Sequence, residues 1–308
     1  MPTWHAAVDR WFGAHHGVAS VPDLVRLGMS EATAYRLVRD GRLDRILPGV
    51  VRSLQFPETD MQVYAAACAR NPAALVGFTS ACRLWGYRKV VDLGQYILVP
   101  HGVSPELPGV VVRRCRRIDP VDIVERPDGI RLTSPPRTLF DSADMLGFST
   151  ARSVMEQVLH EQMCTLGTIT DTVARLAHPN RPGTRTMTAV IASRPAWRTA
   201  LHSDLEMRVL DEIERQRLPT PITQCPVFLP NGITIHLDFG WPQWRVGIEV
   251  DHPAWHAGVE DHHRDTTRDR KAGTIGWLVP RLSQIAVETG LGEAIADVAI
   301  ILGQRRAA

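Results

Sequence analysis

The feature that most constrains the fold is a pair of acidic residues in an otherwise apolar, strand-like segment. In residues 245–251, Glu249 lies between Ile248 and Val250, and Asp251 follows directly. The flanking apolar residues indicate a central strand rather than a solvent-exposed edge. Two further strand-like segments precede it, residues 227–229 and 233–239, around the turn sequence Pro-Asn-Gly.

Side-chain alternation predicts that these acids meet. Successive side chains point to opposite faces of a strand, so Asp238 shares a face with Thr234 and His236, and Glu249 with Asp251. Carboxylates gathered in a sheet repel one another and lose hydration, unless a proton or a cation neutralises them. Mg²⁺ or Mn²⁺ suits oxygen ligands and can activate water against a phosphodiester. The alternative is that these acids lie at strand ends in water.

A helix is expected before these strands, over residues 203–217. Its first turn contains Ser203 and Glu206 at the spacing of a capping box, in which the two side chains satisfy free backbone N–H groups. Glu206 is therefore a candidate both for capping and for catalysis, and the two roles are compatible.

The order of these motifs resembles the Vsr-like branch of the PD-(D/E)XK nuclease superfamily over residues 200–290. The motifs are Glu206, Asp238, Glu249-Val250-Asp251, Trp255-His256, Gly276-Trp277 and Val279-Pro280-Arg281. The resemblance implies a mixed sheet flanked by helices and metal-dependent hydrolysis of DNA. It implies that Asp238 and Glu249 hold the metal ion, that Glu206 assists, and that His256 acts near the scissile phosphate. One departure is Asp251, which occupies the position where the superfamily usually has lysine.

The N-terminal segment predicts three short helices and a hairpin. Helices are expected over residues 4–16, from Ser20 onwards, and over residues 31–40, and a two-stranded wing over residues 43–51. Serine before each of the last two helices and a glycine in the turn between them fit a helix-turn-helix followed by a wing, whose second helix enters the major groove of DNA. The residues left free for DNA on this helix and just after it are Thr33, Arg36, Arg39 and Arg42. An ordinary three-helix bundle with a solvated arginine face is the alternative.

A second group of arginines follows the strand expected over residues 110–114. Arg113, Arg114 and Arg116 form a candidate phosphate-contacting patch, because guanidinium groups bind phosphate oxygens in a forked geometry. A solvated strand end would also account for them. Residues 1–199 carry 24 basic and 18 acidic side chains, whereas residues 200–308 carry 11 basic and 15 acidic ones. The net positive charge of residues 1–199 favours contact with a polyanion in this part of the chain.

The front half also resembles a known family. Residues 17–51, which end in Arg-Leu-Asp-Arg-Ile-Leu-Pro-Gly-Val-Val, look like the N-terminal winged helix of AbiEi-type antitoxins, and residues 77–86 and 133–141 are similar to the adjoining domain of those proteins. The resemblance implies sequence-specific DNA binding.

These patterns predict an α/β chain of three domains. They are a winged helix-turn-helix over residues 1–56, a mixed α/β domain over residues 57–195, and a restriction-endonuclease-like mixed sheet flanked by helices over residues 196–308. The five scattered cysteines contain no C-x-x-C pair, which favours a reducing cytoplasm, and no segment approaches the roughly 18 apolar residues of a membrane span.

Two functions follow from this organisation. In the first, the chain is a DNA endonuclease that depends on Mg²⁺ or Mn²⁺. In the second, it is a non-enzymatic, antitoxin-like transcriptional regulator with a degenerate nuclease fold, as Asp251 at the usual lysine position favours. Double-stranded DNA is the expected partner of either, a homodimer and a cognate toxin are further candidates, and a membrane is not expected.

Overall fold

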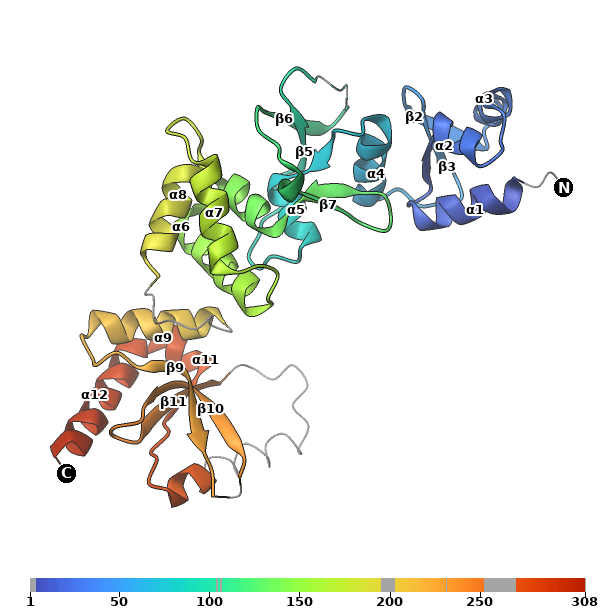
Figure 1. Ribbon diagram of the computed structural model, residues 1–308. Coiled ribbons are helices and arrows are strands. Elements are labelled where there is room, and N and C mark those ends of the chain that lie inside the picture. The colour runs from blue at the N-terminus through green and yellow to red at the C-terminus, as the bar shows by residue number, and fades with distance from the viewer. Residues whose placement is uncertain are drawn as a thin grey trace. The chain divides into compact units, whose positions relative to one another are not determined.

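The computed structural model describes residues 4–103, 105, 107–194, 203–230, 232–251 and 270–307 of the 308-residue chain. The chain forms two compact units, Met1–Val158 with Gln162–Ile191, and Leu159–Glu161 with Ala192–Ala308 (Figure 1). Both units combine helices with sheet, which confirms the predicted α/β class. The finer division into three domains stays a prediction.

The first unit begins with a small part that we call the head, residues 4–53. It contains α1 (His5–Ala14), α2 (Val21–Arg26) and α3 (Glu31–Arg39). Its strands β1 (Val18–Ser20), β2 (Leu43–Leu47) and β3 (Val50–Ser53) form an antiparallel sheet in the order β1-β3-β2. The helices pack on this sheet through a core of buried side chains, among them Val8, Phe12, Leu24, Met29, Ala34 and Val51. The three predicted helices and the hairpin are confirmed.

Local signals account for where the head's helices begin. The Ser20 hydroxyl accepts the Asp23 backbone N–H at 3.1 Å, and the Asp23 carboxylate accepts the Ser20 N–H at 3.1 Å, so α2 starts in a capping box. The Ser30 hydroxyl caps α3 in the same way through the Thr33 N–H. Gly28, with a φ of +96°, turns the chain between the two helices in a conformation that a side chain would oppose.

The rest of the first unit, which we call the middle part, is built on a five-stranded mixed sheet in the order β6-β5-β4-β8-β7. The strands are β4 (Leu75–Val76), β5 (Gln95–Pro100), β6 (Val110–Cys115), β7 (Ile123–Glu125) and β8 (Arg131–Thr133). Its helices are α4 (Asp60–Arg70), α5 (Phe78–Leu84), α6 (Pro135–His160), α7 (Leu166–Leu176) and α8 (Gly183–Ala192). Two helices were expected within residues 134–162, and α6 consists of two helical stretches that meet at Gly147, whose φ of +71° is not helical.

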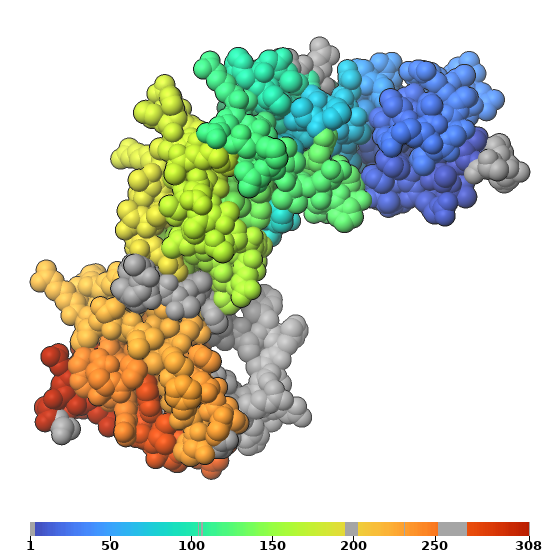
Figure 2. All heavy atoms as spheres, viewed as in Figure 1, coloured from blue at the N-terminus to red at the C-terminus, as the bar shows by residue number. Residues whose placement is uncertain are grey.

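The head and the middle part contact each other through α4 and the turn between β7 and β8. In the space-filling view α4 adjoins the head directly (Figure 2). The Gln62 side chain on α4 donates a hydrogen bond to the His16 carbonyl at 3.0 Å, and His16 Nε2 lies 3.0 Å from Asp128 Oδ2 in the turn. A side chain at Gly129 would come within 3.0 Å of the His15 ring, so this turn approaches the head closely.

The second unit contains a four-stranded sheet in the order β12-β11-β10-β9. β9 (Ile222–Phe228), β10 (Thr234–Trp241) and β11 (Val246–Asp251) are antiparallel neighbours, and β12 (Arg281–Ser283) joins β11 in parallel. Helices α9 (Asp204–Arg215), α11 (Gln284–Thr289) and α12 (Leu291–Ala307) share a core with this sheet. The predicted helix, hairpin and third strand are confirmed, although β9 starts five residues earlier than expected. No helix in the described part of the chain is long and apolar enough to cross a membrane.

Candidate nucleic-acid interface

Helix α3 divides its side chains between a packed face and a free face. Ala34 is buried in the core of the head, and Leu37 and Val38 pack against the same core. The opposite face carries Ala32, Tyr35, Arg36 and Arg39, the i, i+3, i+4 and i+7 positions of one helical stripe, which line a shallow hollow of about 480 Å³. Tyr35 is 49% exposed. A polar, cationic helix face of this kind is free to contact another molecule.

The four residues predicted to contact DNA here have different surroundings. Arg36 and Arg39 are exposed on the free face, where Arg39 Nε lies 3.8 Å from Asp40 Oδ1. Thr33 lies at the rim of the same hollow but is half-buried, and its hydroxyl lies 2.9 Å from that of Ser30 in the cap. Arg42 is exposed just after the helix and does not line the hollow. The structure therefore brings Arg36 and Arg39 together with Tyr35, which the sequence analysis did not single out.

The second predicted group lies in the middle part, on β6 and just after it. Arg113, Arg114 and Arg116 are all exposed. Arg113 and Arg114 line a separate cavity, and Arg114 Nε donates to the Val103 carbonyl at 3.1 Å. Arg116 follows the end of the strand and does not line that cavity. Two of the three predicted arginines therefore line one cavity, and Arg116 lies outside it.

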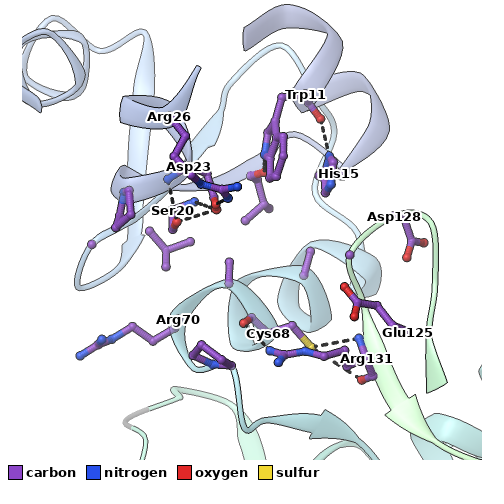
Figure 3. A pocket seen from close by; sticks show the side chains of 18 of the residues that line it. Trp11, His15, Ser20, Asp23, Arg26, Cys68, Arg70, Glu125, Asp128 and Arg131 are labelled. Atoms are coloured by element: carbon purple, nitrogen blue, oxygen red, sulfur yellow. Dashed lines mark hydrogen bonds and ion pairs between the residues drawn. The ribbon is translucent and has the colours of Figure 1, made fainter. Parts of the chain in front are cut away.

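A larger cleft of about 740 Å³ lies between the head and the middle part. One side is formed by α2, and the other by α4 and the turn between β7 and β8 (Figure 3). Arg131 Nη2 donates to the carbonyls of Cys68 and Asn71 at 2.9 and 3.0 Å, which places a cation at the C-terminal end of α4. Burial raises the pKa of the Cys68 thiol, so this cysteine is a packed, neutral group.

Asp128 at the cleft's edge is strongly acidic. Burial alone would raise the pKa of Asp128, but hydrogen bonds from Arg126 and His16 outweigh it and lower the pKa to about 2. Arg126 Nη2 lies 2.8 Å from Asp128 Oδ2, and the Ile130 N–H donates to Oδ1 at 3.2 Å. Asp128 is thus a charged contact between the middle part and the head.

In the second unit, the paired register of β10 and β11 runs from Trp241 opposite Val246 to Phe239 opposite Ile248. Asp238 and Glu249 lie one residue beyond its end, on β10 and β11 respectively. Glu249 is buried to 7% exposure. The Asp238 carboxylate accepts the Val250 N–H at 2.8 Å and the Gln224 side-chain amide at 3.1 Å. The Asp238 carboxylate therefore lies against the β11 backbone next to Glu249, and the convergence of the two carboxylates stays a prediction.

The other predicted acids differ in their roles. Asp251 Oδ1 accepts a hydrogen bond from Arg281 Nε at 2.9 Å, so this acid forms an ion pair across β11 and β12. Glu206 is 1% exposed, its N–H donates to the Ser203 hydroxyl at 3.1 Å, and that hydroxyl lies 3.1 Å from its Oε1. The Ser203 half of the predicted capping box is confirmed, and a catalytic role for Glu206 stays a prediction. His256 lies outside the described residues.

The donor set fits a hydrated metal ion better than an enclosed one. Within the ranges that the structure describes, no three His, Cys, Asp or Glu side chains gather closely enough to hold a metal ion. Mg²⁺ can be bound by one or two carboxylates with several waters, and Asp238 and Glu249 are the two residues that would supply them. Both oxygens of Asp238 already have donors, but a carboxylate has lone pairs for further ligands.

Comparison with known proteins concerns the head first. Residues 7–53 match a family model described as "Transcriptional regulator, AbiEi antitoxin". The match runs from α1 to the end of β3 and contains the whole of α3. The resemblance predicted for residues 17–51 is thereby confirmed, and we refer to this part as the AbiEi-like head. The nuclease resemblance of the second unit stays a prediction.

Two curated relatives match over nearly their whole length. They are the uncharacterized proteins MT2308 and Rv2248 of two Mycobacterium tuberculosis strains, each 25% identical over 275 residues, which are 88% of this chain and 96% of the relative. The crystal structure of the RV2827C protein from the same species is 18% identical, with a TM-score of 0.39, over 66% of this chain and 87% of that one.

Proposed function

We propose that this protein is a transcriptional regulator of the AbiEi antitoxin type that binds duplex DNA through the free face of α3. The observation that carries the proposal is the stripe of Tyr35, Arg36 and Arg39 on a helix whose other face is fixed in the core. In a helix-turn-helix with a wing, the second helix lies in the major groove, and arginine side chains there reach guanine edges and phosphates. The family match over residues 7–53 supports the same function.

The supporting experiment is a binding titration of the full chain on the DNA upstream of its own gene. Arg36→Ala combined with Arg39→Ala is expected to weaken binding at least tenfold. The double variant should also flatten the salt dependence, because the slope of log K against log salt falls by about 0.9 for each phosphate that the protein no longer neutralises. Arg10→Ala combined with Arg305→Ala removes the same charge from exposed positions on α1 and α12 and serves as the control. Equal weakening in both double variants would contradict the proposal.

A second function, metal-dependent hydrolysis of DNA by the second unit, is favoured by the position of the Asp238 carboxylate, which accepts the Val250 N–H next to the buried Glu249. These two residues would hold Mg²⁺ or Mn²⁺, which supplies an activated water and neutralises charge on the phosphodiester. Glu206, Asp251 and His256 are the further candidates for catalysis, with Asp251 held by Arg281.

The nuclease proposal is tested on supercoiled plasmid with Mg²⁺ or Mn²⁺. Nicking is expected from the parent and not from Glu249→Gln or Asp238→Asn, whereas Glu214→Gln on the exposed side of α9 is expected to nick normally. DNA binding by the same variants is measured in parallel. If the parent binds DNA but leaves the plasmid intact with either metal, the protein is a regulator without this activity.

The family match also makes a cognate toxin a proposed partner. Co-expression of this chain with the product of the neighbouring gene tests it, because an antitoxin restores growth that its toxin arrests. The variant Arg36→Ala with Arg39→Ala is expected to restore growth as well as the parent if neutralisation uses a surface other than the DNA-binding face.

A further inference from the structure

A cavity in the middle part has the chemistry of a site for a small anionic ligand. It has a volume of about 360 Å³ and lies between β6, the start of α6 and the loop before α8. Small-molecule sites in proteins commonly measure about 300 to 1,000 Å³. Its lining includes three arginines, two aromatic rings and a cysteine, namely Arg113, Arg137, Arg181, Phe78, Phe140 and Cys115.

Positive charge exceeds negative charge on the walls of this cavity. Four arginines line it, Arg113, Arg114, Arg137 and Arg181, together with the two acids Asp141 and Asp144. Asp141 is shared, because Arg137 Nε lies 2.6 Å from one of its oxygens and Arg181 Nη2 lies 3.2 Å from the other. Arg113 forms no ion pair with any residue that the structure describes. The side chains that line the cavity therefore carry a net positive charge.

Two guanidinium groups in the wall donate to a poor acceptor. Arg137 Nη2 and Arg181 Nη2 each lie 3.3 Å from the Cys115 sulfur. A thiol sulfur is a weak hydrogen-bond acceptor, whereas a phosphate oxygen accepts strongly from two arginines at once. An anionic oxygen in the cavity would thus be a much better partner for these N–H groups than the sulfur is.

These cations are also fixed in place before any ligand arrives. Arg137 is fully buried, and its Nη1 donates to Asp122 at 2.9 Å and to the Arg117 carbonyl at 3.1 Å. Arg181 lies over the Phe140 ring at 5.1 Å from its centroid. Donors that are already ordered lose little entropy on binding, which favours affinity.

The lining also includes an aromatic side chain at a strained backbone position. Phe78 has a φ of +53°, a left-handed conformation that is rare for a bulky residue and is often retained where it serves binding. Gly183 completes the wall, since a Cβ there would lie 2.0 Å from the Phe140 carbonyl oxygen and only glycine permits this approach. An aromatic ring beside clustered arginines suits a ligand that has both a flat ring and a phosphate.

We propose that this cavity binds a nucleoside monophosphate or a closely similar phosphorylated ring compound, with its phosphate against Arg113 and Arg181 and its ring against Phe78. The site lies apart from α3 and does not depend on the proposed DNA-binding function. It would give the protein a small-molecule ligand in addition to its nucleic acid.

The test is calorimetric titration of the full chain with AMP, adenosine and inorganic phosphate. AMP is expected to bind the parent, and adenosine and phosphate at least tenfold more weakly. Arg113→Ala is expected to weaken AMP binding at least tenfold without loss of folding, since Arg113 is exposed and not ion-paired within the described residues. Arg185→Ala, an exposed arginine two residues after Gly183 that does not line the cavity, is the matched control and should bind AMP normally.

Four outcomes of these titrations would overturn the proposal. They are no AMP binding by the parent, equal binding of adenosine, equal binding of phosphate, and unchanged AMP binding by Arg113→Ala. A further arm separates a free nucleotide from the phosphates of bound DNA. AMP binding is repeated with saturating duplex, and if the duplex displaces AMP and Arg113→Ala weakens both ligands alike, the cavity serves DNA and the proposal fails.

Discussion

The arginines of α3 and those of the middle part show how one side-chain type can serve opposite purposes. On α3, Arg36 pairs with no acidic side chain among the described residues, and Arg39 has only the long contact with Asp40. In the middle part, Arg137 is fully buried between Asp122 and Asp141, and Arg175 binds Asp119 and Asp122. An exposed, unpaired arginine keeps its charge available to a polyanion, whereas a buried, paired one holds separate segments together.

The largest effect expected from this contrast is on stability. Arg137→Met removes a buried cation and takes one partner from each of Asp122 and Asp141, so the free energy of unfolding should fall by about 3 to 5 kcal/mol. Arg36→Ala should change it by less than about 0.5 kcal/mol, because this side chain is exposed. Urea denaturation of both variants measures the difference. Similar decreases in the two would contradict the division between structural and free arginines.

The second effect is a loss of stability at low pH, caused by protonation of Asp128 at the contact between the head and the middle part. The folded-state pKa of Asp128, about 2, lies below the ordinary value, so its charge stabilises the fold above the unfolded pKa and this contribution is lost as pH falls towards 2. The loss should approach about 2 kcal/mol. Asp128→Asn should lower stability near neutral pH and reduce its dependence on pH between about 5 and 2, as measured by thermal unfolding across that range. Parallel curves for parent and variant would show that Asp128 is not the group responsible.

The third effect concerns the free face of α3 itself. Tyr35→Ala should weaken binding to the operator about tenfold, or about 1.4 kcal/mol, while the melting temperature stays close to that of the parent, because Tyr35 is exposed. Tyr35→Phe separates the ring from the hydroxyl. Fluorescence anisotropy with labelled duplex measures the affinities. A fall in melting temperature in Tyr35→Ala would instead place this ring in the core of the head.

The smallest effect concerns the caps that fix α3. Ser30→Ala removes the acceptor for the Thr33 N–H and should cost about 1 kcal/mol of stability, whereas Ser30→Gly should cost only a few tenths. The two variants are compared by urea denaturation. Equal costs would mean that the Ser30 hydroxyl does not cap the helix in solution.

The sequence predicted the head well because its signals are local. Ser20 and Ser30 before their helices and Gly28 between them fix boundaries that the structure reproduces within one or two residues. The positions of Arg36 and Arg39 followed from helical periodicity alone. The same periodicity could have shown Tyr35, which lies four residues before Arg39 on one stripe.

Features that depend on distant contacts were not predictable in this way. β1, β4, β7, β8 and β12 are two or three residues long, too short for an alternating pattern. Arg181 reaches Cys115 across 66 positions and Asp141 across 40, so no spacing rule reveals the network. In the second unit, alternation could not show that Gln224 and the Val250 N–H bind Asp238, or that Arg281 pairs with Asp251. The convergence of Asp238 and Glu249, which alternation predicts, stays a prediction.

The shortness of α3 limits how much sequence one copy of the protein can read. Nine residues at 1.5 Å per residue give a helix of about 13 Å, which spans about four base pairs at 3.4 Å each. A sequence of four base pairs recurs by chance roughly once every 256 base pairs, which is far too often to mark one promoter among millions of competing positions. Selective control of a single gene would therefore require a second copy of α3 on the DNA. Two copies of the protein on an inverted repeat, with half-site centres about 34 Å apart, would supply it.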